Sequence, residues 1–173
     1  MSRSDLSAAI RDIPDFPVAG VVFKDITTLI KDPRLFKESV DLLAAEFSGR
    51  EIDLVVSIEA RGFIFGAAMA YQLGAGVVPV RKEGKLPHKT RKVGYSLEYG
   101  TATVEIHEDA IPSGSRVLIV DDLLATGGTL AATVDLVRGL GGEVEAVAVL
   151  IELDFLKGRE KLKDVPIFSL LHY

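Results

Sequence analysis

The stretch that decides the fold is Val117-Leu118-Ile119-Val120-Asp121-Asp122-Leu123-Leu124-Ala125-Thr126-Gly127-Gly128-Thr129. Its apolar start predicts a buried strand, because strands covered on both faces have continuous hydrophobic runs. Two carboxylates and a loop of small residues follow, and after Thr129 apolar residues recur at helical spacing. A strand, a polar loop and a helix in this order form the arrangement in which backbone N–H groups and the helix dipole hold a phosphate.

The acidic pair Asp121-Asp122 indicates what the phosphate is attached to. Two carboxylates repel a bare phosphate, so their expected partners are hydroxyl groups or a hydrated cation. A phosphate beside a diol is a sugar phosphate. Neighbouring strand residues point to opposite faces, so at most one carboxylate lies in a packed layer while the other faces the crevice. The alternative is a helix cap or turn carboxylate, which accounts for one Asp but poorly for two.

Two common phosphate-binding motifs are missing from this loop. No Lys follows Gly127-Gly128, as a P-loop requires, and the Gly-x-Gly-x-x-Gly fingerprint of dinucleotide-binding folds is also absent. The two glycines nevertheless allow backbone angles closed to other residues and a close approach of an anion.

Length and composition predict one ordinary globular domain over residues 1–173. The formal charge of -5 gives no reason to expect nucleic-acid binding. The chain has no Cys, and its three His are far apart, so we expect no zinc site. Phe63–Val80 lacks charged residues, but its glycines and Pro79 favour a buried helix, a turn and a strand over a membrane span. With no secretory signal in Met1–Arg11, we expect a soluble, cytoplasmic protein without a membrane partner.

The rest of the chain predicts an α/β fold with a mostly parallel, Rossmann-like sheet flanked by helices. The expected helices are Ser4–Asp12, Asp32–Phe47, Gly62–Leu73, the segment after Thr129 and Phe155–Leu162. The further expected strands are Val21–Asp25, Leu54–Ile58, Val77–Val80, Ser96–Tyr99, Ala102–Ile106, Ala146–Ile151 and Ile167–Leu171. Ligands bind such sheets at the carboxyl ends of the strands. Three strand-end segments are therefore expected in one neighbourhood: Glu59–Gly62, Arg81–Tyr95 and Asp121–Thr129, the second as a long mobile loop.

The opening stretch resembles the ribose-phosphate signature of the type I phosphoribosyltransferases, which use phosphoribosyl pyrophosphate (PRPP). The version Leu-Leu-Ala-Thr-Gly-Gly-Thr is most similar to the adenine branch of that family, because the hypoxanthine-guanine branch usually has an aspartate where this chain has Ala125. The resemblance extends from about Asp12 to the C-terminus and implies the fold of that family with a small N-terminal hood, residues 1–30.

The resemblance assigns roles at the first two strand ends. Asp121 and Asp122 would bind the ribose hydroxyls, and the 5′-phosphate would be held by Ala125, Thr126, Gly127, Gly128 and Thr129. In Glu59-Ala60-Arg61-Gly62, Arg61 would contact pyrophosphate, which a guanidinium fork at a strand end suits chemically. The alternative is a surface Arg61 paired with Glu59.

The basic segment resembles the catalytic flexible loop of the family, residues 81–100. Arg81, Lys82 and Lys85 would meet pyrophosphate, whereas composition alone favours a solvated basic loop. Glu98 would act as general acid near the purine, and Tyr99 would shape the closed site.

The segment Val21–Asp25 resembles the hood that binds the base. Phe23 would stack on adenine, with backbone groups of Val22 and Lys24 reading its edge and Leu123 covering its other face. On composition alone, a core residue is the better explanation of Phe23.

The implied reaction joins adenine to PRPP and yields AMP and pyrophosphate, as in purine salvage. The resemblance also implies a homodimer and Mg²⁺ carried mainly by PRPP, with no dedicated metal site built from protein ligands. Two alternatives stay open from the sequence: a sibling enzyme for another purine or for orotate, and a non-catalytic regulator that senses PRPP.

Overall fold

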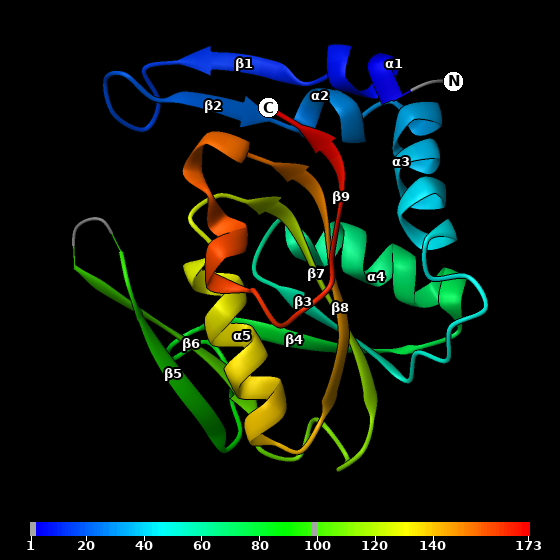
Figure 1. Cartoon of the computed structure of the whole chain (residues 1–173), viewed down its shortest axis with the longest axis vertical. Helices are drawn as coiled ribbons and strands as arrows, with labels where there is room; N and C mark the ends of the chain where they lie inside the picture. The colour runs from blue at the N-terminus through cyan, green and yellow to red at the C-terminus, as the bar shows by residue number, and fades with distance from the viewer. Residues whose placement is uncertain (1–2, 98–99) are drawn as a thin grey trace. The chain divides into compact units, whose positions relative to one another are not determined.

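The computed structural model describes residues 3–97 and 100–173 (Figure 1). The chain forms two compact units, Met1–Leu42 and Leu43–Tyr173. The interpretation of residues 1–173 as one functional domain stays a prediction.

The N-terminal unit is built around a small antiparallel sheet. Its strands are β1 (Arg11–Pro14) and β2 (Val22–Asp25), and its helices are α1 (Arg3–Ala8), α2 (Thr27–Ile30) and the start of α3 (Pro33–Ala45). As predicted, Asp32 caps α3, because its Oδ1 accepts the backbone N–H groups of Arg34 and Leu35. The predicted helix Ser4–Asp12 is too long. It ends at Ala8 because the residues after it pair with β2.

The second unit holds a seven-stranded sheet in the order β5-β6-β4-β3-β7-β8-β9. The five strands from β4 to β9 in this order are parallel, while β6 and β5 add an antiparallel edge. The strands are β3 (Leu54–Ile58), β4 (Gly76–Lys82), β5 (Thr90–Ser96), β6 (Thr101–His107), β7 (Arg116–Leu124), β8 (Glu143–Glu152) and β9 (Ile167–His172). The predicted mostly parallel α/β sheet is confirmed.

The helices of this unit are α4 (Gly62–Leu73) and α5 (Gly128–Gly139), followed by the 3-10 segments η1 (Asp154–Leu156) and η2 (Gly158–Lys161). The chain leaves β3 for β4 on one side and β7 for β8 on the other. Because parallel crossovers are right-handed, α4 and α5 cover opposite faces of the sheet. Figure 1 shows α5 in front of the strands and α4 behind them. Valine, isoleucine and leucine side chains of the strands and α5 fill the core between them.

Neighbouring strands β3 and β7 are the point where the direction of the crossovers reverses. They pair in parallel, with Ser57 opposite Val120, so their carboxyl ends lie together. The segments that leave these two ends turn to opposite faces of the sheet and open a crevice between them.

The segment Arg81–Tyr95, predicted as a long mobile loop, is mostly regular structure. β4 runs on to Lys82, and β5 begins at Thr90 and pairs with β6 along its whole length. The strand was missed because it lies at the sheet edge, where exposed basic side chains are common. The predicted strand Ser96–Tyr99 does not begin at Ser96, because Ser96 is the last residue of β5.

One further difference concerns a helix. The helix predicted over Phe155–Leu162 consists of the separate segments η1 and η2, interrupted at Lys157, which has a left-handed backbone. In Phe63–Val80 the predicted helix, turn and strand are confirmed: α4 ends at Leu73, with Gly74 as its C-cap, and β4 begins at Gly76. Among the residues that the structure describes, no helix combines the length and apolar character needed to cross a membrane.

Candidate active site

A cleft of about 250 Å³ opens at the carboxyl ends of β3, β4 and β7. The residues that line it include members of all three strand-end segments predicted to meet there: Glu59, Ala60, Arg61, Arg81, Lys82, Asp121, Asp122, Leu123, Ala125 and Thr129. Apolar side chains of the sheet and Tyr95 complete the lining.

The acidic pair lies on β7 itself, which continues to Leu124. Both carboxylates line the cleft, and Asp122 is the more buried of the two, with 5% of its surface exposed. Asp121 Oδ1 accepts the backbone N–H of Asp122 at 2.8 Å. Burial, and next the negative charge of Asp122, raise the pKa of Asp121 well above its ordinary value.

Arg61 comes from the turn after β3 and reaches across to β7. Its Nε lies 2.5 Å from Asp122 Oδ2, so its carboxylate partner is Asp122 and not the predicted alternative, Glu59. The turn approaches β7 closely at Gly62, where an added Cβ would lie 2.7 Å from Asp121 Oδ1. Ser57 Oγ donates a hydrogen bond to the Gly62 carbonyl at 2.8 Å and so ties the turn to β3. The Glu59–Ala60 peptide bond is cis.

Glu59 is bound to the end of β4. It accepts a hydrogen bond from Arg81 Nη2 at 2.9 Å and another from the Lys82 backbone N–H at 3.0 Å. The Arg81 hydrogen bond is the main cause that lowers the pKa of Glu59. Arg81 Nη1 also donates to the carbonyl of Lys85, whose side chain does not line the cleft.

The turn between β4 and β5 is held by the buried carboxylate of Glu105 on β6. Glu105 accepts the backbone N–H groups of Lys85 and Leu86, each at 3.0 Å, and the Thr90 hydroxyl at 3.1 Å. Burial acts to raise the pKa of Glu105, but these donors and Lys92 outweigh it and lower the pKa.

A second, smaller cavity of about 70 Å³ adjoins the cleft at the start of α5. Its lining is Asp121, Leu123, Ala125, Thr126, Gly127, Gly128, Thr129 and Leu130. Gly127, at the N-cap of α5, has φ +80°, and no side chain caps the first turn. The positive end of the helix and its backbone N–H groups therefore face a cavity of anion size.

Two residues of the predicted segments have roles in the site that were not predicted from the sequence. Tyr95 on β5 lines the cleft, and its hydroxyl accepts the Thr129 hydroxyl at 2.9 Å. Glu59 was considered only as a partner of Arg61, whereas it holds Arg81. The alternation of Val93 and Tyr95 with polar neighbours was the available sign that this basic segment is a strand.

Among the described residues, the lining of the cleft does not include every predicted site residue. Glu98 and Tyr99 lie outside the described residues. Val22, Phe23 and Lys24 belong to β2 of the N-terminal unit. The rings of Phe23 and Phe16 pack edge-on there, with their centroids 5.2 Å apart. Their predicted contacts with a base stay predictions.

Comparisons with known proteins agree with this geometry. Residues 27–170 match the phosphoribosyl transferase domain family. The chain is 60% identical to the adenine phosphoribosyltransferase of Acidobacterium capsulatum over 97% of its length and 93% of that protein, and 55% identical to that of Chloroflexus aurantiacus over the full length of both. It matches the crystal structure of the adenine phosphoribosyltransferase from Thermoanaerobacter pseudethanolicus with a TM-score of 0.97 and 52% identity, covering 99% of this chain and 100% of that one. The chain belongs to the phosphoribosyltransferase family and, within it, to the adenine phosphoribosyltransferases.

Proposed function

We propose that this chain transfers the 5-phosphoribosyl group of PRPP to adenine and releases AMP and pyrophosphate. The observation that carries the proposal is the meeting of an acidic pair, an uncapped glycine-rich helix start and basic side chains in one cleft. These groups suit a diol, a 5′-phosphate and a pyrophosphate in that order. A relative from Saccharomyces cerevisiae, 44% identical with a TM-score of 0.92, was solved in complex with adenine and an imino-altritol bisphosphate.

The donor sugar would be held at the end of β7. The ribose hydroxyls would bind Asp121 and Asp122, and the 5′-phosphate would occupy the smaller cavity formed by residues 125–129. Recognition there relies on backbone N–H groups and the dipole of α5, because none of these five residues carries a charge.

The leaving pyrophosphate would bind Arg61, Arg81, Lys82 and Lys85. Arg61 and Arg81 are paired with Asp122 and Glu59. Pyrophosphate would therefore compete with carboxylates for both guanidinium groups. The C1′–oxygen bond to pyrophosphate breaks as N9 of adenine bonds to C1′, and the cations stabilise the charge that develops on the leaving group.

The base would bind between Phe23 and Leu123, with its edge read by the backbone of Val22 and Lys24. The purine must lose a proton as N9 bonds to C1′, and Glu98 would accept that proton from N7. In the reverse direction the protonated carboxyl group would donate it to N7, which is the general-acid role that the resemblance implies. Closure of the site around the base would exclude water, the competing nucleophile.

Mg²⁺ is expected to arrive with PRPP, where it supplies neutralising charge to the pyrophosphate oxygens. The cleft carboxylates support this view, because each is already engaged: Glu59 by Arg81, Asp122 by Arg61, and Asp121 by the Asp122 backbone N–H. The raised pKa of Asp121 also makes that carboxyl group a poor cation ligand.

The test is a steady-state assay with PRPP, Mg²⁺ and a panel of purines. We expect the highest kcat/KM with adenine, and a preference for hypoxanthine or guanine would overturn the base assignment. Absence of turnover with every purine, together with tight binding of PRPP, would identify a sensor.

Two sets of variants test the residue roles. Glu98→Gln should lower kcat far more than it weakens PRPP binding, because it removes only the carboxyl group that exchanges a proton with N7. Unchanged turnover would exclude Glu98 from the chemistry. The double variant Asp121→Asn, Asp122→Asn should weaken the binding of PRPP, and retained affinity would contradict the diol assignment.

We further propose a cytoplasmic homodimer. The outer face of α4 and the neighbouring β4 expose apolar side chains, with Tyr71 91%, Val77 48% and Ile64 36% exposed. An apolar face of this kind fits a second copy of the chain. Sedimentation velocity would decide between a dimer and a monomer.

A further inference from the structure

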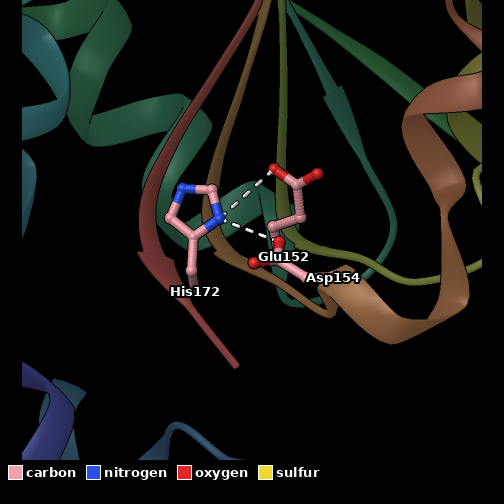
Figure 2. A group of neighbouring side chains, drawn as sticks. All are labelled: Glu152, Asp154 and His172. Atoms are coloured by element: carbon pink, nitrogen blue, oxygen red, sulfur yellow. Dashed lines mark hydrogen bonds and ion pairs between the residues drawn. The ribbon is translucent and has the colours of Figure 1, made fainter.

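A group of charged side chains at the ends of β8 and β9 is not used by the proposed reaction. Figure 2 shows His172 directed toward Glu152 and Asp154. His172 Nδ1 lies 2.9 Å from Asp154 Oδ1 and 3.9 Å from Glu152 Oε2. Such a group can hold a metal ion in principle. Here Glu152 is already bound by a cation of the chain itself, Arg159, so a metal ion would meet a guanidinium group.

Glu152 on β8 and Arg159 in the 3-10 segment η2 form a bidentate ion pair. Arg159 Nε and Nη2 donate to the two carboxylate oxygens of Glu152 at 2.6 and 2.7 Å. Glu152 is only 3% exposed, and the hydroxyl of Ser169 donates to it as well. Arg159 Nη1 also reaches the Ile167 carbonyl at 3.3 Å. These contacts tie one end of η2 to β8 and β9.

The residue before Arg159 in the chain, Gly158, lies directly against the candidate phosphate loop. A Cβ added at Gly127 would lie 2.4 Å from the Gly158 carbonyl oxygen, and one added at Gly158 would lie 2.3 Å from the Ala125 carbonyl oxygen. The two backbones thus meet without intervening side chains. Any shift of Gly158 therefore changes the space available to the backbone of Ala125–Thr129.

We propose that Arg159, held by Glu152 and Ser169, is a positioning residue for the 5′-phosphate subsite, and that it acts through the backbone of Gly158. The proposal rests on the proposed function, because it takes residues 125–129 as the phosphate loop. Arg159 itself does not line the cleft or the smaller cavity. Its loss should weaken recognition of the phosphate and leave recognition of the pyrophosphate unchanged.

The experiment compares Arg159→Met with Arg138→Met in the full-length protein. Arg138 is a matched control, because both arginines are 44% exposed, but the partner of Arg138, Asp164, is 70% exposed. Calorimetric titrations would use ribose 5-phosphate and magnesium pyrophosphate as separate probes. We expect Arg159→Met to raise the Kd for ribose 5-phosphate about tenfold and to change the Kd for pyrophosphate less than about twofold. Arg138→Met should change neither.

Arg159→Met leaves a buried carboxylate without its cation and can unfold the protein. The double variant Glu152→Gln, Arg159→Met removes both charges and keeps an acceptor for Ser169, so it leaves no unpaired buried charge. It should show the same selective loss of ribose 5-phosphate affinity. Equal weakening of both probes in the double variant would indicate a merely structural role and overturn the proposal.

Gly158→Ala tests the last step, from η2 to the loop. Its methyl group would enter the space of the Ala125 carbonyl, whereas Gly139→Ala would meet only the flexible end of Arg91. Gly158→Ala should reduce ribose 5-phosphate affinity and Gly139→Ala should not. Unchanged affinity in Gly158→Ala would overturn the proposal. If the unmodified protein binds neither probe, the proposed function fails instead.

Discussion

The phosphate loop after β7 and the basic turn after β4 would bind neighbouring parts of one substrate in different ways. The loop Ala125–Thr129 has no charged side chain and offers the start of α5. Arg81 and Lys82 lie at the end of β4, where this turn begins, and the guanidinium group of Arg81 is bound to Glu59. One region uses backbone groups whose direction is set by local geometry. The other uses side chains whose position depends on carboxylates far away in the sequence.

This difference indicates how each region can fail. Backbone recognition is lost when the path of the chain shifts, which a single methyl group can cause. Side-chain recognition depends on the residues that hold the cations and the turn, and it weakens by degrees. Changes in the phosphate loop should therefore have the larger effects.

The largest effect is expected for Gly127→Ala. The residue has φ +80°, and its new Cβ would lie 2.4 Å from the Gly158 carbonyl oxygen. The left-handed backbone alone costs about 1–2 kcal/mol, and relief of the clash must move the loop. A displacement of the donor phosphate of this kind should lower kcat/KM for PRPP about 100-fold.

Gly114→Ala is the control for Gly127→Ala. It has nearly the same backbone angle, φ +81°, but nothing lies within 4 Å of an added Cβ. It should show the loss of stability in thermal unfolding without the loss of activity. If the two variants have similar kcat/KM values, the close approach to Gly158 does not matter.

A smaller effect is expected for Glu105→Gln, which loosens the basic turn. The carboxylate is 2% exposed and accepts from Lys85, Leu86 and Thr90, and an amide can satisfy only part of this set. We expect a loss of about 1–3 kcal/mol in the free energy of unfolding. The KM for PRPP should rise about tenfold while kcat changes less.

Acid unfolding gives a second measurement on this variant. The lowered pKa of Glu105 contributes stability that is present above its ordinary value of 4.5 and is lost as the pH falls through the folded-state pKa. That part of the acid sensitivity should disappear in Glu105→Gln. Glu83→Gln, which removes an exposed partner of Lys92, should stay within about 0.5 kcal/mol of the unmodified protein. An equal effect of both substitutions would contradict the role of Glu105.

The smallest effect, of opposite sign, is expected for Asp121→Asn. The raised pKa of Asp121 means that stability is highest below its ordinary value of 3.8 and falls as the pH rises through the folded-state pKa. At pH 7 the Asn variant should therefore have the higher Tm. The advantage should vanish below pH 3.8, where Asp121 is neutral in both states. A lower Tm of the variant at pH 7 would show that the ionised carboxylate is well accommodated.

The site at β7 could be predicted from the sequence because its parts are contiguous. The apolar run Val117–Val120, the acidic pair and the glycines lie within thirteen residues, and each follows a local rule. Strand β3 and helix α4 were predicted with their observed bounds for the same reason.

The basic segment could not be predicted in this way. Its strand β5 is specified by pairing with β6 and by a buried Glu105, whose partners are 15 to 20 residues away in the sequence. Arg61 shows the same limit, since its carboxylate partner, Asp122, is 61 positions away. Composition made Glu59 the nearer alternative, but the parallel pairing of β3 and β7 brings Asp122 within reach.

The sequence by itself determined the α/β class, the bounds of β3 and α4 and the glycine-rich loop that starts α5, because these depend on hydrophobic periodicity and on backbone freedom within a few residues. The tertiary structure alone decided which carboxylate holds which cation, how the basic turn is fixed, and that Gly158 packs against Gly127. Those contacts join residues distant in the chain, and only the folded sheet brings their backbones and charges together.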